Sequence, residues 1–194
     1  MPTVTRTRTI EASPQDVWEV LSDPHHLPRW WPRVSRVEAV TLKGTGELQG
    51  VTDGEAPPAG GGGHPEGHKQ GGVPRAFTEV LTSAKGKIVR ADFQVLDAVA
   101  MQRIVWAQEL ENTPFAKVLR SAETEIGLAD APGAHGPCTE VTIELRQELQ
   151  GFMPKSGRSS WISGVSRFGS PLVRRAALAT VEEALDGLER IVGR

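Results

Sequence analysis

The sequence of 194 residues has no tyrosine, one cysteine and no long apolar run. The single cysteine, Cys138, cannot form an intramolecular disulfide and excludes a metal site built from cysteines alone. No segment approaches the roughly eighteen apolar residues that cross a bilayer, and the N-terminal residues lack the apolar run of a signal peptide. These absences predict a soluble protein of the reducing cytoplasm. Because no catalytic motif surrounds Cys138, we expect it to be a small core residue.

A basic excess is also missing. The chain has 22 Lys and Arg against 24 Asp and Glu, a net charge of -2. A general nucleic-acid binder normally carries positive charge to set against phosphates, so we expect no nucleic-acid partner. Hydrophobic residues make up 38% and charged residues 24%, the balance of a globular protein. The length suits one domain, residues 1–194.

Residues 53–74 differ in composition from the rest of the chain. They contain eight glycines and four prolines, too little apolar surface to offset ordering, and so predict a flexible insertion. His64, Glu66 and His68 resemble a metal cluster by residue type. The intervening proline and glycine, however, prevent the helix that would place both imidazoles on one face. We therefore predict a polar loop and no metal site.

The stretch 10–34 carries the most specific local signals. Ser13 is a good N-cap, Pro14 suits the first helical position, and Asp16 lies where a capping box places an acidic residue. A Ser-Asp-Pro sequence then ends the helix. A short turn follows and contains the tryptophan pair Trp30 and Trp31.

Alternating apolar and polar residues predict seven strands. The predicted strands are residues 3–10, 34–42, 76–82, 88–96, 103–110, 116–128 and 138–149. The first of them has no strongly apolar face. We expect it to be paired on both sides with modest burial; the alternative is a polar cavity wall that offers Arg6 or Arg8 to an anionic ligand.

A long helix is predicted at the C-terminal end, with Ser170 as N-cap and Pro171 at the first position. Its apolar stripe recurs at steps of three and four residues and consists of Leu178, Val181, Leu185, Leu188 and Val192. Gly187 lies within this helix, where glycine costs about 1 kcal/mol relative to alanine. Either the backbone approaches the sheet or a ligand closely there, or the glycine is a tolerated surface residue.

The opening motif resembles the START-like superfamily, the SRPBCC type that includes polyketide cyclases/dehydrases and lipid transport proteins. The residues that carry the resemblance are Ala12, Pro14, Val17, Trp18, Asp23, Pro24, Leu27, Pro28, Trp30 and Pro32. The resemblance implies an α+β helix-grip fold. In that fold a curved antiparallel sheet wraps around a long C-terminal helix, and two short helices follow the first strand.

The resemblance also implies a cavity between sheet and helix that holds a small hydrophobic molecule, such as a lipid, a polyketide or an isoprenoid-like compound. Large aromatic surfaces suit apolar ligands, and a few polar groups orient them. We expect no cofactor. The predicted ligand-binding residues are Trp30, Trp31, Phe93, Trp106, Val141, Ile143, Leu145, Leu178, Val181 and Leu185.

The sequence is also consistent with two other functions. An enzyme of the cyclase or dehydratase type would need an acid or base in the cavity, and the candidates are Glu123, Glu125, Asp92 and His25. A peripheral membrane or partner-binding module would use residues 150–181, which contain five basic and no acidic side chains interleaved with aromatic residues. For that segment we favour an ordinary solvated connection over contact with an anionic membrane.

Overall fold

The structure is a computed structural model, and it describes residues 3–42, 73–82, 86–111, 113–117, 119–133, 136–150 and 165–193. The predicted insertion at 53–74 lies outside these residues except for its last two positions. Of the basic segment at 150–181, residues 151–164 also lie outside them. The fold and the site below are built from the described residues alone.

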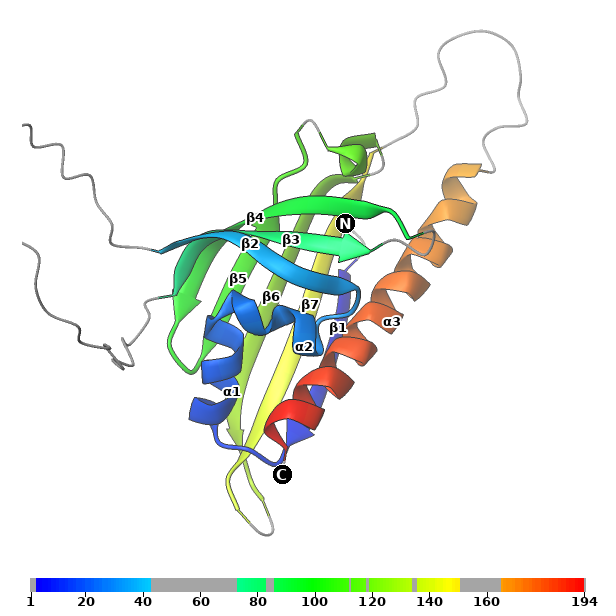
Figure 1. The fold of residues 1–194 in the computed structure, drawn as a ribbon. Helices are drawn as coiled ribbons and strands as arrows, with labels where there is room; N and C mark the ends of the chain where they lie inside the picture. Colours follow the sequence, from blue (N-terminus) through cyan, green and yellow to red (C-terminus); the bar gives the residue numbers. More distant parts are fainter. Residues whose placement is uncertain are drawn as a thin grey trace, which may run out of the picture.

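The described strands form one curved antiparallel sheet in the order β1-β7-β6-β5-β4-β3-β2 (Figure 1). Their bounds are β1 Thr3–Ile10, β2 Val34–Leu42, β3 Pro74–Thr82, β4 Ile88–Val99, β5 Arg103–Gln108, β6 Leu119–Ala131 and β7 Cys138–Leu149. From β2 to β7 each strand pairs with the next one in the chain, and β1 then pairs with β7. The predicted α+β class and meander are confirmed.

Helices cover the inner side of this sheet (Figure 1). They are α1 Pro14–Ser22, the 3-10 turn η1 Pro24–His26, α2 Leu27–Trp30 and the long α3 Val165–Val192. A second 3-10 turn, η2 Pro114–Lys117, lies in the connection between β5 and β6. The predicted cap of α1 is confirmed, because the backbone N–H of Asp16 donates to Ser13 Oγ at 3.2 Å. Helix α3 packs against β1, β7 and α2.

The prediction that the first strand is paired on both sides is wrong, since β1 is an edge strand whose sheet partner is β7. Its arginines are engaged by α3 instead of lining a cavity. Arg6 Nε lies 2.6 Å from Glu182 Oε1, and Arg8 forms ion pairs with Glu182, Asp186 and Glu189. The ion pairs hold the helix along the open edge.

Two predicted boundaries are corrected. Helix α3 begins at Val165, so Pro171 lies inside the helix and not at its first position. A proline near the start of a helix removes one hydrogen bond, which the longer helix tolerates. Strand β6 begins at Leu119, because the residues from Pro114 to Lys117 form the turn η2.

The core lies where α1, α2 and the C-terminal half of α3 meet the sheet. Gly187 is the point of closest approach: a Cβ atom there would lie 2.8 Å from Cα of Trp30 and closer still to the Trp30 carbonyl oxygen. The predicted close approach of the backbone is therefore present, but its partner is α2 and not the sheet or a ligand. Only glycine lets the backbones of α2 and α3 touch in this way.

Candidate functional site

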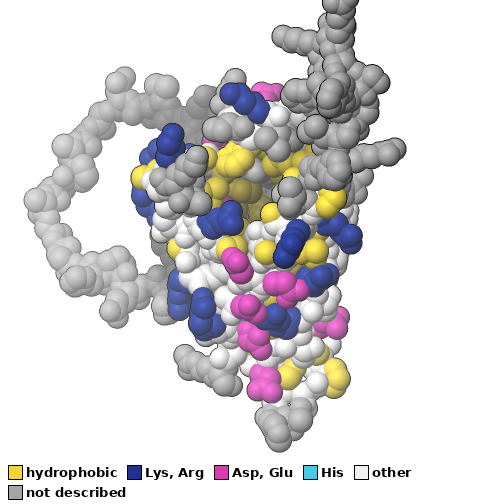
Figure 2. Space-filling model, turned by 90° about the vertical axis from the view of Figure 1, so that its right-hand side faces the viewer, with side chains coloured by type: hydrophobic (Ala, Val, Ile, Leu, Met, Phe, Trp, Pro, Cys, Tyr) yellow, Lys and Arg dark blue, Asp and Glu magenta, His cyan; other side chains and the backbone are white. Residues whose placement is uncertain are grey.

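A cavity of about 450 Å³ opens between the inner face of the sheet and the N-terminal half of α3. Strands β3 to β7 supply its walls, and the segment after α2, the turn η2 and α3 complete it. Figure 2 shows hydrophobic side chains gathered around a hollow in the upper half of the face on which α3 lies. The site is therefore a concave pocket lined mainly by apolar side chains.

Aromatic rings form much of the cavity wall. The rings of Trp31 and Trp106 meet edge to face with their centroids 6.1 Å apart. Phe77 stacks on Phe93 at 5.3 Å and meets Trp106 at 6.2 Å. Phe115 adds a further ring from η2. These contacts fix the rings in place, so the cavity presents a largely preformed apolar surface.

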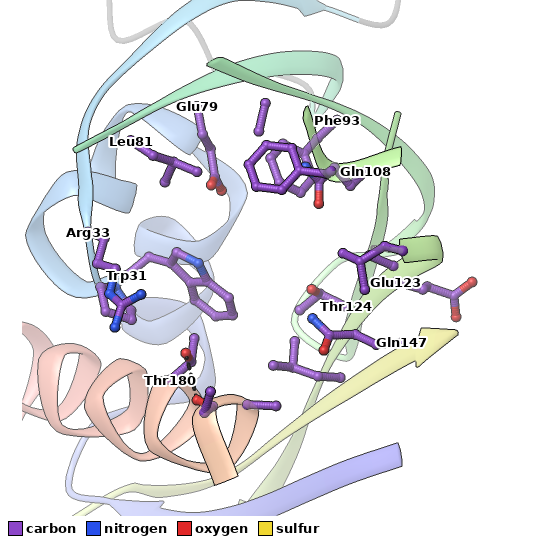
Figure 3. A pocket seen from close by; sticks show the side chains of 18 of the residues that line it. Trp31, Arg33, Glu79, Leu81, Phe93, Gln108, Glu123, Thr124, Gln147 and Thr180 are labelled. Atoms are coloured by element: carbon purple, nitrogen blue, oxygen red, sulfur yellow. Dashed lines mark hydrogen bonds between the residues drawn. The ribbon is translucent and has the colours of Figure 1, made fainter. Parts of the chain in front are cut away.

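Polar side chains interrupt this surface at a few positions. Gln108, Thr124 and Gln147 point into the cavity from β5, β6 and β7 (Figure 3). Thr180 lies opposite them on α3, where its hydroxyl donates to the carbonyl oxygen of Ala176 at 3.0 Å. Hydroxyl and amide groups can each donate or accept, so they can orient a ligand without selecting one sign of charge.

Glu79 is the acidic group inside the cavity. It projects from β3 into the open space (Figure 3), its side chain is 2% exposed, and Oε1 has no hydrogen-bond partner among the described residues. Its cross-strand neighbours are Val37 and Ala91, both apolar. Burial in these surroundings raises the pKa of Glu79 to about 8. At neutral pH the carboxyl group is therefore mostly uncharged.

The mouth of the cavity carries a cation. Arg33 borders the pocket and is exposed, and it adopts a left-handed backbone conformation with φ of 67° between α2 and β2. This turn also carries Trp31 and Pro32 to the rim. A positive charge therefore lies near the entrance, while the described interior is neutral or acidic.

The structure divides the predicted ligand-binding residues into two groups. Trp31, Phe93, Trp106 and Leu145 line the cavity. The others are Trp30, Val141, Ile143, Leu178, Val181 and Leu185, which belong to the packed core or lie against it. Val141 and Ile143 share the inner face of the sheet with the first group, but α1 and α3 pack over β7 there. Trp30 lies on α2, and Leu178, Val181 and Leu185 lie on α3, so these four belong to the helices that cover the sheet. The periodicity of apolar residues predicts which residues face inward, but not whether an inward-facing residue borders the cavity or belongs to the packed core.

None of the four predicted acid or base residues points into the cavity. Glu123 and Glu125 turn to the outer face, where their carboxylates lie 2.5 Å and 2.7 Å from the Arg146 guanidinium. Hydrogen bonds to Glu125 and Glu123 raise the pKa of Arg146 above its usual range. Asp92 accepts a hydrogen bond from Thr78 at 2.5 Å on the outer face, and His25 is exposed.

Sequence reasoning missed Glu79, although the signal was present. Phe77, Glu79 and Leu81 share one parity of β3, so the acidic residue lies on the same face as two apolar ones. An acidic residue inside an apolar face is the pattern that marks a buried carboxyl group.

Within the described ranges, no group of three or more His, Cys, Asp or Glu is placed to hold a metal ion. His64, Glu66 and His68 lie outside those ranges. In the same part of the chain, no helix has the length and apolar character that crossing a membrane requires.

The curved sheet, the gripping helix and the cavity between them define a START-like protein of the helix-grip type. More particularly, the chain belongs to the polyketide cyclase/dehydrase and lipid transport family, whose pattern it matches over residues 1–193. The resemblance inferred from the opening motif is thereby confirmed. Among curated proteins, no relative matches this sequence.

Solved structures agree with this assignment at the level of the fold. A START superfamily protein from Mycobacterium smegmatis is 15% identical with a TM-score of 0.62, and the match covers 98% of this chain and 96% of that one. A conserved protein from Geobacillus kaustophilus is 14% identical with a TM-score of 0.60, covering 98% and 95%. The Zhui aromatase/cyclase from a Streptomyces species is 17% identical with a TM-score of 0.56, covering 97% and 94%.

Proposed function

We propose that this protein binds a small hydrophobic molecule in the cavity between the sheet and α3. The observation that carries the proposal is the cavity itself, about 450 Å³ in volume and walled by Trp31, Phe93, Trp106 and Phe115. A pocket of this size, mainly apolar with a few inward polar groups, is typical of small-molecule sites. The family includes lipid transport proteins, which agrees with an apolar ligand.

The shape of the pocket favours a flat, partly aromatic ligand. Rings of Trp31 and Trp106 meet at an interplanar angle of 72°, so they offer one ring face and one ring edge to a neighbour. Aromatic ligands stack on the faces and contact the edges of such rings. Gln108, Thr124 and Gln147 would then orient oxygen atoms of the ligand.

Binding is tested on the purified protein by native mass spectrometry and by titration with a panel of lipids and aromatic polyketides. We expect an extractable apolar molecule, or quenching of tryptophan fluorescence on titration. Ala177→Phe places a ring in the cavity from α3, and we expect it to weaken binding at least tenfold.

Leu96→Phe is the matched control, because Leu96 is 55% exposed on β4 and lies outside the cavity. This variant should bind like the wild type. Apo protein in every preparation, together with no response to the panel, would contradict the proposal.

A second function is favoured by one observation. A cyclase or dehydratase needs a proton donor in the cavity, and Glu79 is a buried carboxyl group that points into it with a pKa raised by burial to about 8. A group that titrates near neutral pH is suited to general acid catalysis. The aromatase/cyclase from Streptomyces shares the fold, and at 17% identity this likeness extends to the fold alone.

The enzyme hypothesis is tested with a β-hydroxy ketone on a naphthalene ring, followed by the absorbance of its dehydration product. Catalysis by Glu79 predicts turnover that falls at least a hundredfold in Glu79→Gln, with binding retained. Equal turnover by both proteins, or none by either, would remove this hypothesis and leave binding unaffected.

Contact with an anionic membrane through residues 150–181 remains a proposal of lower rank. Residues 151–164 lie outside the described residues, so the structure adds no support to it. Sedimentation with anionic vesicles at low and high salt tests it, since an electrostatic contact is lost as salt screens the charges. No binding at low salt would exclude it.

A further inference from the structure

Glu79 is the feature of the cavity that an apolar ligand alone does not explain. Its side chain is 2% exposed, and Oε1 lacks a hydrogen-bond partner among the described residues. Buried polar atoms are nearly always paired, because leaving one unpaired destabilises the fold. Figure 3 shows the carboxyl group directed into the open space of the cavity and not toward a neighbouring strand. The carboxyl group as a whole therefore points toward the position of a ligand.

No cation neutralises Glu79 from the described walls. Strands β4, β5 and β7, the turn η2 and α3 contribute no titratable side chain to the described lining. The charged residues at its border are Arg33, which is exposed at the mouth, and Glu123, whose carboxylate bonds Arg146 on the outer face. Without a cation, burial favours the uncharged acid, and the pKa of Glu79 is raised accordingly.

We propose that Glu79 determines specificity by donating a hydrogen bond from its uncharged carboxyl group to a neutral carbonyl oxygen of the bound molecule. This inference rests on the proposed binding function and deepens it by naming the ligand class. The ligands are uncharged, mainly aromatic ketones, esters or quinones, and neither plain hydrocarbons nor carboxylates belong to the class.

The chemistry of the acid selects this class. A protonated carboxyl group has one O–H donor, and a carbonyl oxygen is the acceptor that completes it. A hydrocarbon leaves the donor unpaired. A carboxylate would have to lose its hydration in a cavity whose bordering cation, Arg33, lies exposed at the mouth, and an unpaired buried charge is costly.

The test compares three probes of one ring system on the full chain. They are acetylnaphthalene, which has a ketone; isopropenylnaphthalene, which has a carbon in place of the oxygen; and naphthoate, which has a carboxylate. Binding is followed by the fluorescence of tryptophan, since Trp31 and Trp106 line the cavity. Wild type, Glu79→Leu and Glu79→Gln are measured at about pH 6, where Glu79 is protonated. Circular dichroism establishes that each variant is folded.

In Glu79→Leu, we expect the affinity for acetylnaphthalene to fall about tenfold relative to that for isopropenylnaphthalene, the usual effect of one hydrogen bond. Glu79→Gln keeps a donor in its amide group, so it should retain the ketone preference within about threefold. Naphthoate should bind the wild type more weakly than acetylnaphthalene. The ratio of two affinities is used because it removes effects common to both probes.

The pH dependence of binding separates the wild type from Glu79→Gln. As the pH rises through the pKa of Glu79, the wild type loses its donor and should bind acetylnaphthalene about tenfold more weakly at about pH 9 than at about pH 6. Isopropenylnaphthalene weakens too, because any apolar ligand strips water from the carboxylate. Glu79→Gln does not titrate, so its affinities should be constant over this range.

The possible results distinguish the inference about Glu79 from the proposed binding function. If both neutral probes bind and Glu79→Leu leaves their affinity ratio unchanged, the inference is overturned and the proposed binding function stands. Tighter binding of naphthoate than of acetylnaphthalene also overturns it and points to Arg33 instead. If no probe binds the wild type, both the inference and the proposed function are contradicted for aromatic ligands.

Discussion

The two halves of α3 pack against the same sheet but leave different amounts of space. In the C-terminal half, Val181, Leu185 and Leu188 are at most 1% exposed and belong to the core. Closer to the N-terminal end, Ala177 and Thr180 border the cavity. The side chains that α3 contributes to the described cavity lining are valine, alanine and threonine, all smaller than the leucines of the other half. Helix α3 therefore packs tightly against the sheet along its C-terminal half, the gripping half, and borders the cavity nearer its N-terminus.

The short helices strengthen this contrast. Helices α1 and α2 both contact α3, and Gly187 places the α2 contact in its C-terminal half. Arg190 adds a hydrogen bond to the backbone carbonyl of Arg29 at 3.3 Å. Most of the stretch 10–34 thus packs against the C-terminal half of α3, away from the cavity. Its last residues, Trp31, Pro32 and Arg33, border the cavity.

The largest predicted effect concerns Glu79 and the pH dependence of stability. The pKa of Glu79 is raised from its model-compound value of 4.5 to about 8, so between these values the folded state holds a proton that the unfolded chain has released. The free energy of unfolding therefore falls as the pH rises across this window, by on the order of 5 kcal/mol at most. In Glu79→Gln this contribution is absent.

Urea unfolding of both proteins between about pH 5 and about pH 8 measures the difference. The stability of Glu79→Gln relative to the wild type should increase steadily with pH. Parallel stability curves would show that Glu79 titrates normally and that the cavity end is as well solvated as the surface.

A pair of truncations tests the contrast within α3 directly. Leu188→Ala removes a fully buried side chain from the gripping half and should cost about 3 kcal/mol of unfolding free energy, because it leaves a cavity in the core. Val173→Ala removes atoms that already border open space and should cost less than about 1 kcal/mol. Equal losses in urea unfolding would mean that the two halves are packed alike.

Gly187→Ala tests the closest contact of the gripping half. The added methyl group meets the backbone of Trp30, which cannot move aside as a side chain can. We expect a net loss of about 2 kcal/mol, even though alanine is the better helix former. Gly127→Ala is the control, since a Cβ atom at Gly127 meets nothing within 4 Å. If Gly187→Ala is as stable as this control in thermal unfolding, α2 and α3 do not touch there.

Most of the fold was predictable from the sequence because its signals are local. Strands β2 and β7 have the predicted bounds, and the cap at Ser13 is formed as predicted. Alternation and capping act between neighbours in the chain, so they can be recognised without a structure. The pairing of β1 was not predictable in this way, because strand order depends on contacts between distant segments.

The candidate site was less predictable for the same reason. Periodicity placed Trp106 and Val141 on the inner face alike, yet Trp106 borders the cavity and Val141 is fully buried in the core. What separates them is the covering element, which sequence parity does not reveal. Glu79 was missed because a carboxylate on a strand usually faces solvent, and its burial depends on the curvature of β3 over the cavity.

The smallest predicted effect concerns Arg8, which joins the edge strand to the gripping half of α3. Arg8 forms ion pairs with Glu182, Asp186 and Glu189, and its side chain is 26% exposed. Surface ion pairs contribute little individually, so Arg8→Gln should lose about 1 kcal/mol or less, and the loss should diminish as salt is added. Urea unfolding at low and high salt measures this.

The affinity for an aromatic probe should be the same in Arg8→Gln as in the wild type, because Arg8 does not border the cavity. Arg36→Gln, which breaks an ion pair with Glu38 on β2, serves as a control for the general effect of removing a surface charge. If Arg8→Gln weakened ligand binding and Arg36→Gln did not, the ion pairs at the gripping end would also set the width of the cavity. A change at the C-terminal half of α3 would then alter the cavity, so the two parts of the helix would be structurally coupled.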